Sequence, residues 1–158
     1  FELRGLSITA GYHRLFSHRA YDAHPLIKFF FLVFGASAFQ NSVLKWGSDH
    51  RVHHNKVDTS EDPYNINEGF FYAHMGWILV KGNEYDPRYV QDLAADKWIR
   101  LQHKYYFPIA GFFGIILPAI MGWLFFNSLL GGIGEADTAV VCKDVGFYIE
   151  DEDGRADF

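Results

Sequence analysis

Twenty-eight consecutive residues without a formal charge, from Phe107 to Gly134, constrain this chain more than any other feature. About 20 apolar residues are enough for a helix to cross the hydrocarbon core of a bilayer. We therefore predict one membrane span at about residues 107–133, kinked at Pro118, because helices in lipid tolerate proline. A buried core helix is the alternative, and 28 uncharged residues in a chain of 158 argue against it.

A second apolar stretch, residues 29–44, is only 16 residues long and lies between Lys28 and Lys45. It is shorter than a usual span, and it contains polar residues. It also separates two groups of histidines, which a single crossing would place on opposite faces of a membrane. We therefore predict a helix that is buried in the protein or lies at the membrane interface.

A third helix is predicted after Asp86 and Pro87, which offer an N-cap and a proline at the first helical position. Apolar side chains then recur at roughly helical spacing, at Val90, Leu93, Ala94, Trp98, Leu101 and Tyr105. Basic residues lie among them. This pattern predicts an interfacial amphipathic helix that leads into the span.

Charge divides the chain into two parts. Residues 1–133 carry 12 Lys/Arg and 11 Asp/Glu, whereas residues 134–158 carry 2 and 8. Eleven of those 12 basic residues lie between Arg14 and Lys104, and an excess of Lys/Arg marks the cytoplasmic side of a membrane. We predict one helical domain at 1–133, with its histidines on the cytoplasmic side, and an acidic, disordered or unrelated tail at 134–158. No nucleic-acid partner is expected.

Two histidine groups carry the candidate chemistry. His13 and His18 are five residues apart, and His50, His53 and His54 stand at i, i+3 and i+4. On an α-helix the second group falls within an arc of about 100°, so its imidazoles can converge. The first pair lies about 140° apart, too wide for one ion on a regular helix. Either His18 lies on unwound chain after a helix that ends near His13, or the two histidines serve different ions.

Five neutral imidazoles suit a transition metal. A magnesium or calcium site would use oxygen ligands, and zinc takes four ligands, so five histidines indicate more than one ion. The alternative is a set of ordinary interfacial histidines, which two spaced clusters make a poor explanation. Of the remaining histidines, we expect His24 and His103 at the surface or interface, and His74 is a candidate to support the site from behind the ligands.

The segments GYHRLFSHRAY and DHRVHHNKVDTSEDPYNINEGFFYAHMGWILV closely resemble the first two histidine boxes of the membrane fatty acyl desaturases, the stearoyl-type delta-9 acyl-CoA group. The intervening AFQNSVLKW is similar as well, and the resemblance runs from about Gly5 to Trp123. A lone HxxxxH is a weak signal. The two boxes together, with the QN pair between them and GFFxxHxGW after them, are highly specific.

This resemblance implies an all-α membrane protein: transmembrane helices with a cytosolic helical cap that carries the histidine boxes. It implies two iron ions, with five ligands in this chain: His13, His18, His50, His53 and His54. It also implies a narrow tunnel that bends the acyl chain beside the metal, with five residues near the substrate channel or its entrance: Asn41, Trp46, Asp49, Trp77 and Lys81. No catalytic residue is expected beyond the metal ligands.

The chain departs from the family pattern in two places. Ser48 stands where acyl-CoA members commonly have Arg, which leaves another thioester or a lipid-linked acyl chain open as the substrate. The third box, an HxxHH beyond a further span, has no counterpart in residues 134–158. We therefore expect a fragment, without the family's N-terminal span or its third box, from a truncated or misread gene; a native solvated tail is the alternative.

Three functions remain open on this sequence. The first is an O2-dependent desaturase that inserts a cis double bond into an acyl chain and takes electrons from a ferredoxin or a b-type cytochrome. The second is a related di-iron membrane hydroxylase, because such enzymes share these boxes. The third is an inactive membrane fragment. Membrane lipids are expected partners in each case, in a bacterial inner membrane or the endoplasmic reticulum.

Overall fold

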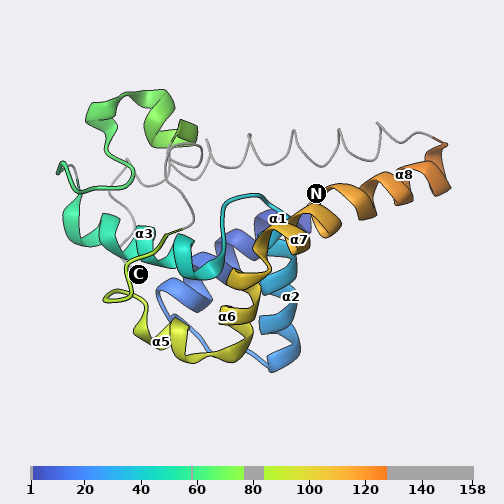
Figure 1. Cartoon of the computed structure of the whole chain (residues 1–158), viewed down its shortest axis with the longest axis horizontal. Helices are drawn as coiled ribbons and strands as arrows, with labels where there is room; N and C mark the ends of the chain where they lie inside the picture. The colour runs from blue at the N-terminus through green and yellow to red at the C-terminus, as the bar shows by residue number, and fades with distance from the viewer. Residues whose placement is uncertain (1, 58, 77–83, 128–158) are drawn as a thin grey trace.

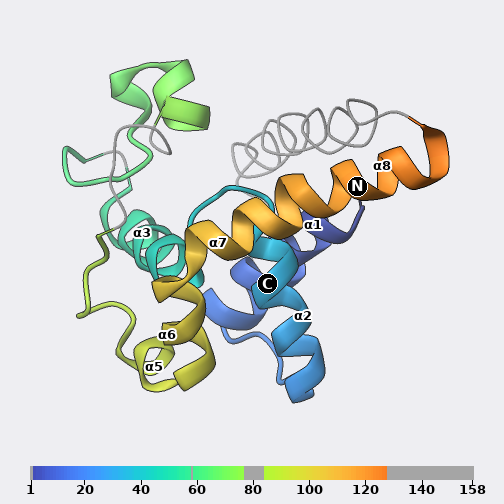
Figure 2. The same cartoon turned by 45° about the vertical axis from the view of Figure 1, so that its right-hand side comes forward.

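A computed structural model of the chain describes residues 2–57, 59–76 and 84–127. Every regular element among these residues is helical, which confirms the all-α prediction for this part of the chain. The elements are α1 (Glu2–Leu6), η1 (Ser7–Ser17), α2 (Pro25–Ala36), α3 (Val43–Lys56), η2 (Ile66–Glu68), η3 (Tyr72–Gly76), α5 (Gln91–Ala95), α6 (Lys97–Lys104), α7 (Tyr106–Gly111), η4 (Phe112–Ile116) and α8 (Leu117–Phe126). Figures 1 and 2 show α7 and α8 as one long arm that projects from a bundle of the earlier helices.

The bundle is held by apolar packing around a buried polar network. Tyr12 of η1 is fully buried, and its hydroxyl accepts a hydrogen bond of 2.7 Å from Nε2 of Gln102 in α6. The same side-chain amide accepts from the N–H of Val43 and donates to the carbonyl of Leu32. One glutamine therefore joins η1, α2, α3 and α6, and burial of its polar atoms costs little because each has a partner.

The apolar stretch at 29–44 forms one short helix and a turn. Helix α2 has 12 residues, about 18 Å in length, whereas a bilayer core is about 30 Å thick. One side of α2 packs into the bundle through Phe31, Leu32 and Ala36, and the other side exposes Leu26 and Phe29. The helix is therefore packed against the protein along one side, and it is too short to cross a membrane.

The amphipathic segment differs from its prediction in where it begins. Asp86 does not cap a helix, because its carboxylate accepts hydrogen bonds from the backbone and guanidinium of Arg88. A turn follows, and α5 starts at Gln91. The chain then breaks at Asp96, whose carboxylate accepts from Trp98 N–H and caps α6. The prediction of one continuous helix from Pro87 was wrong. Asp86 and Asp96 each accept a hydrogen bond from the backbone N–H two residues later, and such local bonds compete with helix formation.

The predicted span corresponds to a continuous helix of 20 residues, Tyr106–Phe125, made of α7, η4 and α8. It is the one helix among the described residues that is long and apolar enough to cross a membrane. Large apolar side chains cover its surface, and Phe107, Leu124 and Phe125 are among the most exposed. Residues 128–133, the end of the predicted span, and the tail at 134–158 lie outside the described residues.

A buried arginine donates a hydrogen bond to the irregular part of this helix. Pro118 has no N–H to donate to the carbonyl of Gly114 four residues earlier, and the turn before it, η4, is π-helical. Nη2 of Arg4 donates to that carbonyl at 2.7 Å, from a side chain that is itself buried. The N-terminal helix is thereby fastened to the long arm at the point where proline interrupts its hydrogen bonds.

We expect Arg4→Met to destabilise the protein by about 1–3 kcal/mol, the usual cost of a hydrogen bond to a charged group. The same substitution in a Pro118→Ala background should cost less, because alanine at that position can supply the missing N–H donor. Thermal unfolding of the four proteins in one detergent measures both costs. Equal losses in the two backgrounds would contradict this account of Arg4.

Candidate metal centre

Four imidazoles from two distant segments meet at one point. His13, His18, His50 and His54 each offer a ring nitrogen, and these four atoms lie within 4.8 Å of one another. Nε2 of His18 is 3.0 Å from Nε2 of His13 and 2.9 Å from Nε2 of His50, which is 3.0 Å from Nε2 of His54. We call these residues the four-histidine cluster.

A π-helix explains how His13 and His18 share the cluster. Eleven residues, Ser7–Ser17, are π-helical, and the N–H of His18 donates to the carbonyl of His13 at 3.0 Å. A hydrogen bond between residues five apart places them nearly one above the other. The 140° separation expected on an α-helix therefore does not arise, and both side chains reach the same point. Short π-helical segments are frequent at functional sites.

Hydrogen bonding alone does not satisfy the cluster. A neutral imidazole nitrogen has one in-plane position, which holds either a proton or a lone pair. Nε2 of His18 faces two other nitrogens at about 3 Å, and so does Nε2 of His50. Each of these two atoms can therefore form a linear hydrogen bond with only one of its two neighbours. A cation among four lone pairs removes the conflict. Two nitrogens at right angles around an ion, each at about 2.1 Å, are about 3.0 Å apart. The donor set therefore fits a transition-metal ion.

Burial keeps the cluster in its metal-binding form. Burial, together with the neighbouring His18 and His54, lowers the pKa of His13 to about 4. Burial lowers the pKa of His50 much further, and the other imidazoles again add to the effect. Both rings are therefore neutral at physiological pH, and a neutral ring is required for metal binding.

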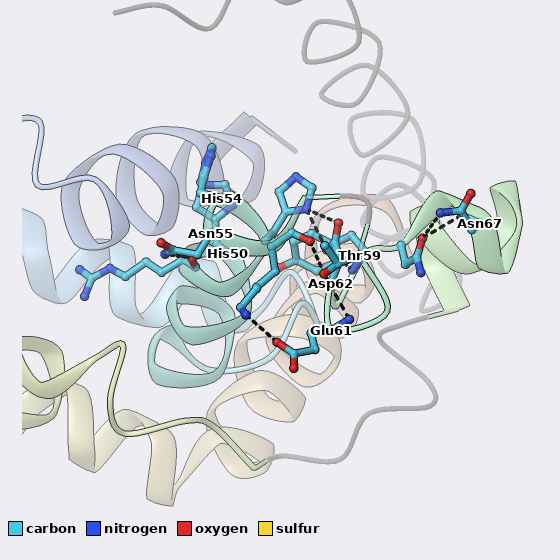
Figure 3. A network of polar contacts seen from close by, with 12 residues as sticks. His50, His54, Asn55, Thr59, Glu61, Asp62 and Asn67 are labelled. Atoms are coloured by element: carbon cyan, nitrogen blue, oxygen red, sulfur yellow. Dashed lines mark hydrogen bonds and ion pairs between the residues drawn. The ribbon is translucent and has the colours of Figure 1, made fainter.

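His53, the fifth predicted ligand, is not part of the four-histidine cluster. Its Nδ1 lies 2.9 and 3.0 Å from the two carboxylate oxygens of Asp62 (Figure 3). On a helix, His53 and His54 point about 100° apart on either side of His50. His54 turns toward η1, and His53 turns toward the loop that carries Asp62. His53 stays a predicted ligand, although not of the same ion.

The residues predicted to line a substrate channel lie in different surroundings. The ring of Trp46 stacks on His50 with centroids 4.7 Å apart, and it donates from Nε1 to Gln40. Asn41 has a left-handed backbone, and its buried Nδ2 has no hydrogen-bond partner among the described residues. Asp49 forms a buried ion pair of 2.6 Å with Lys45. Trp77 and Lys81 lie outside the described residues, and so does the side chain of His74.

The other histidines and Ser48 have local partners. His24 is exposed and caps α2, as its ring accepts from Leu26 N–H. His103 is half-buried, and its Nδ1 is 2.6 Å from the hydroxyl of Ser42. Ser48 is buried, and its hydroxyl accepts from Asp86 N–H at 2.9 Å. A small side chain at position 48 thus lets the loop at Asp86 lie directly on α3.

Sequence reasoning missed Arg51, which joins the two histidine segments. Its five N–H donors all have acceptors within 3.1 Å: the carbonyls of Phe16, Ser17 and Tyr89, and both oxygens of Asp92. Arg51 follows His50 on α3, and Ser17 precedes His18 at the end of η1. The arginine therefore sets the position of one histidine segment against the other. Its only signal in the sequence is its place inside the second motif.

Together, the helical fold and the cluster define a class: α-helical proteins with four converging histidines that could hold a metal ion, and with a helix long and apolar enough to cross a membrane. Comparison with known sequences narrows this class. The chain is 44% identical over 133 residues to a probable acyl-CoA desaturase of Schizosaccharomyces pombe, 40% over 138 residues to acyl-CoA desaturase 1 of Saccharomyces cerevisiae, and 41% over 130 residues to a stearoyl-CoA desaturase of Homo sapiens. No family model matches the chain.

These alignments cover 81%, 84% and 77% of this chain. They cover 27%, 26% and 35% of the three relatives, so the chain spans about a quarter to a third of their length. The matched part of the chain belongs to the acyl-CoA desaturase family, which confirms the resemblance of the histidine motifs. It corresponds to one segment of those longer proteins.

We expect the metal-free protein to lose stability as the pH falls from about 6.5 to about 4. An unfolded histidine takes up a proton near pH 6.5, whereas folded His13 does so only near pH 4, so the unfolded state binds more protons in this window. Denaturation midpoints at pH 7.5 and 4.5 measure the loss. His13→Gln should reduce it and the exposed control His24→Asn should not; an equal loss in all three proteins would contradict the assignment.

Arg51→Lys should destabilise the protein by about 2–4 kcal/mol, because lysine keeps the charge and loses the planar set of five donors. The matched control is Arg88→Lys, which alters an exposed ion pair with Asp86 and should change stability far less, because an ion pair in water contributes little. Chemical denaturation of both variants makes the comparison. Similar small effects would show that Arg51 does not hold the two segments together.

Proposed function

We propose that this chain is the histidine-bearing part of a membrane fatty acyl desaturase that inserts a cis double bond, of the delta-9 type, into an acyl thioester such as acyl-CoA. The observation that carries the proposal is the convergence of His13, His18, His50 and His54, from two separate motifs, in a chain related to proteins named acyl-CoA desaturases. Imidazole ligands suit iron, so a histidine site of this kind can support redox chemistry with O2.

Two iron ions are the proposed cofactor. The four-histidine cluster would hold one of them, and His53, which lies beside the cluster, would contribute to the other. When bound, the iron pair supplies the capacity to reduce O2 with electrons from outside the chain. In the balanced reaction, –CH2–CH2–, O2, two electrons and two protons give –CH=CH– and two molecules of water. A ferredoxin or a b-type cytochrome would deliver the electrons.

The chain's own residues would position the substrate. Trp46 lies flat on His50, so its indole offers an apolar wall directly beside the metal ligands. Asn41 offers a buried N–H group without a partner among the described residues, which would suit an acceptor on the substrate or an ordered water. The Lys45–Asp49 ion pair lies on α3 directly before His50, with Asp49 as the adjacent residue. Trp77 and Lys81 are proposed at the channel on the family resemblance alone.

The long helix supports the proposed placement in a membrane. Tyr106–Phe125 is about 30 Å long, matches a bilayer core, and presents exposed Phe, Ile, Leu and Trp side chains that suit lipid. Lys97 and Lys104 lie over the rings of Trp98 and Tyr105 just before it, an arrangement typical of a membrane interface. The excess of basic residues around the cluster favours the cytoplasmic side, in a bacterial inner membrane or the endoplasmic reticulum.

Desaturation is tested with the full-length gene product in membranes that contain a b-type cytochrome and its reductase. Supplied with stearoyl-CoA, O2 and NADH as the electron source, it should form oleoyl-CoA, whose acyl chain gas chromatography with mass spectrometry identifies as oleate. His54→Gln should lower the rate at least 100-fold, and His24→Asn should leave it unchanged. Hydroxystearate without oleate would favour a hydroxylase and overturn the proposal, and so would full activity in His54→Gln.

Metal binding is tested on the 158-residue chain itself. Purified in detergent and loaded anaerobically with Fe²⁺, it should retain at least one iron per chain by elemental analysis. His50→Ala removes the central nitrogen of the cluster and should abolish retention, and the control His24→Asn should match the unchanged protein. Iron retained equally by all three proteins would show that the four-histidine cluster is not the site.

A further inference from the structure

Asp62 determines which nitrogen of His53 carries the proton. Both oxygens of its carboxylate lie within hydrogen-bonding distance of Nδ1, at 2.9 and 3.0 Å. An ionised carboxylate only accepts hydrogen bonds, so Nδ1 must be the donor and the neutral ring must have its lone pair at Nε2. None of the described residues forms a hydrogen bond with that Nε2, and the His53 side chain is about one-fifth exposed at 22%.

The carboxylate is itself held in place. The Asp62 side chain is 1% exposed, and its Oδ1 also accepts a hydrogen bond of 2.9 Å from the N–H of Tyr64. The backbone N–H of Asp62 donates to the carbonyl of Thr59 (Figure 3). The ring of Tyr64 packs against the ring of His53, with centroids 5.1 Å apart. If the Asp62 carboxylate turned away from His53, it would also lose its hydrogen bond from Tyr64 N–H.

This arrangement matches the usual support of a metal-bound histidine. A ligating imidazole commonly donates its second N–H to a carboxylate, which fixes the ring and makes the coordinating nitrogen more basic. His53 already has this support, and its ring lies 5.7 Å from that of His54, at the edge of the four-histidine cluster. A contact that only tethered the loop to α3 would not require Nε2 of His53 to lack a hydrogen-bond partner among the described residues.

We propose that Asp62 is a positioning residue: it fixes the tautomer and orientation of His53 so that Nε2 is free to bind a metal ion outside the four-histidine cluster. The identity of that ion as the second iron rests on the proposed function. The fixed tautomer does not, because it follows from the carboxylate–imidazole contact alone.

The first test reads the tautomer in metal-free protein. With ¹⁵N-labelled histidine, long-range ¹H–¹⁵N correlation spectra at pH 8 should show His53 protonated at Nδ1, with His53→Gln identifying its signals. Asp62→Ala should move the proton largely to Nε2. Asp62→Asn, which keeps an acceptor for Tyr64 N–H and so preserves the loop, should shift it partly. The idea fails if unchanged protein carries the proton at Nε2, or if Asp62→Ala has no effect.

A matched control separates the tautomer from simple anchoring of the loop. Lys56 and Glu61 form a second ion pair, of 2.8 Å, between the same helix and the same loop without touching His53 (Figure 3). Lys56→Gln should therefore leave the His53 tautomer unchanged. A shift as large as that in Asp62→Ala would show that any tether of the loop has this effect, and would overturn a specific role for Asp62.

The second test titrates Zn²⁺ into the same labelled proteins and follows Nε2 of His53. Unchanged protein should show a metal-induced shift of this nitrogen, and Asp62→Ala should need about 10–100-fold more zinc, the usual loss when such support is removed. Equal zinc dependence in the two proteins would overturn the proposal. Absence of desaturation in the activity assay, with both spectroscopic results as expected, would remove the proposed function and leave the role of Asp62 intact.

Discussion

The contact of 2.9 Å between the imidazoles of His18 and His50 is the constraint on which the rest of this structure depends. It joins two segments 32 residues apart, so the chain between them must leave and return to the same place. Helix α2 and the turn at residues 37–42 make that return, with left-handed backbone at Phe39 and Asn41. If the chain between His18 and His50 crossed a membrane, it would have to cross an even number of times to bring the two histidines together. This segment is too short for two crossings.

Buried polar groups specify how the helices sit against one another. Gln102 joins four elements at the centre of the bundle, Arg51 joins the two histidine segments, and Arg4 joins the first helix to the long arm. Each of these side chains donates its hydrogen bonds to backbone carbonyls or to another fixed side chain. The cost of burying its polar atoms is therefore offset in only one arrangement of the helices. Apolar packing alone would tolerate sliding of these helices, and a metal site needs positions fixed within a fraction of an ångström.

The four-histidine cluster and the long apolar helix occupy different parts of the molecule. The cluster lies where α3 and the end of η1 meet, with His18 and His54 exposed and His50 buried. The long apolar helix leaves the bundle in a different direction (Figures 1 and 2). The exposed imidazoles of the cluster and the apolar helix therefore lie in different parts of the molecule.

The sequence by itself determined the helical class, the long apolar helix and four of the residues that meet in the cluster, because charge-free length and motif spacing are local properties. It also indicated that the segment at 29–44 does not cross a membrane. Only the tertiary structure decided that His13 and His18 share one point, because a π-helix differs from an α-helix through hydrogen bonds that residue types do not reveal. The separation of His53 from the cluster and the role of Arg51 likewise depend on partners 9 and 41 residues away. The start of α5 at Gln91 depends on local hydrogen bonds of Asp86 that compete with the helix. None of these can be read from a motif.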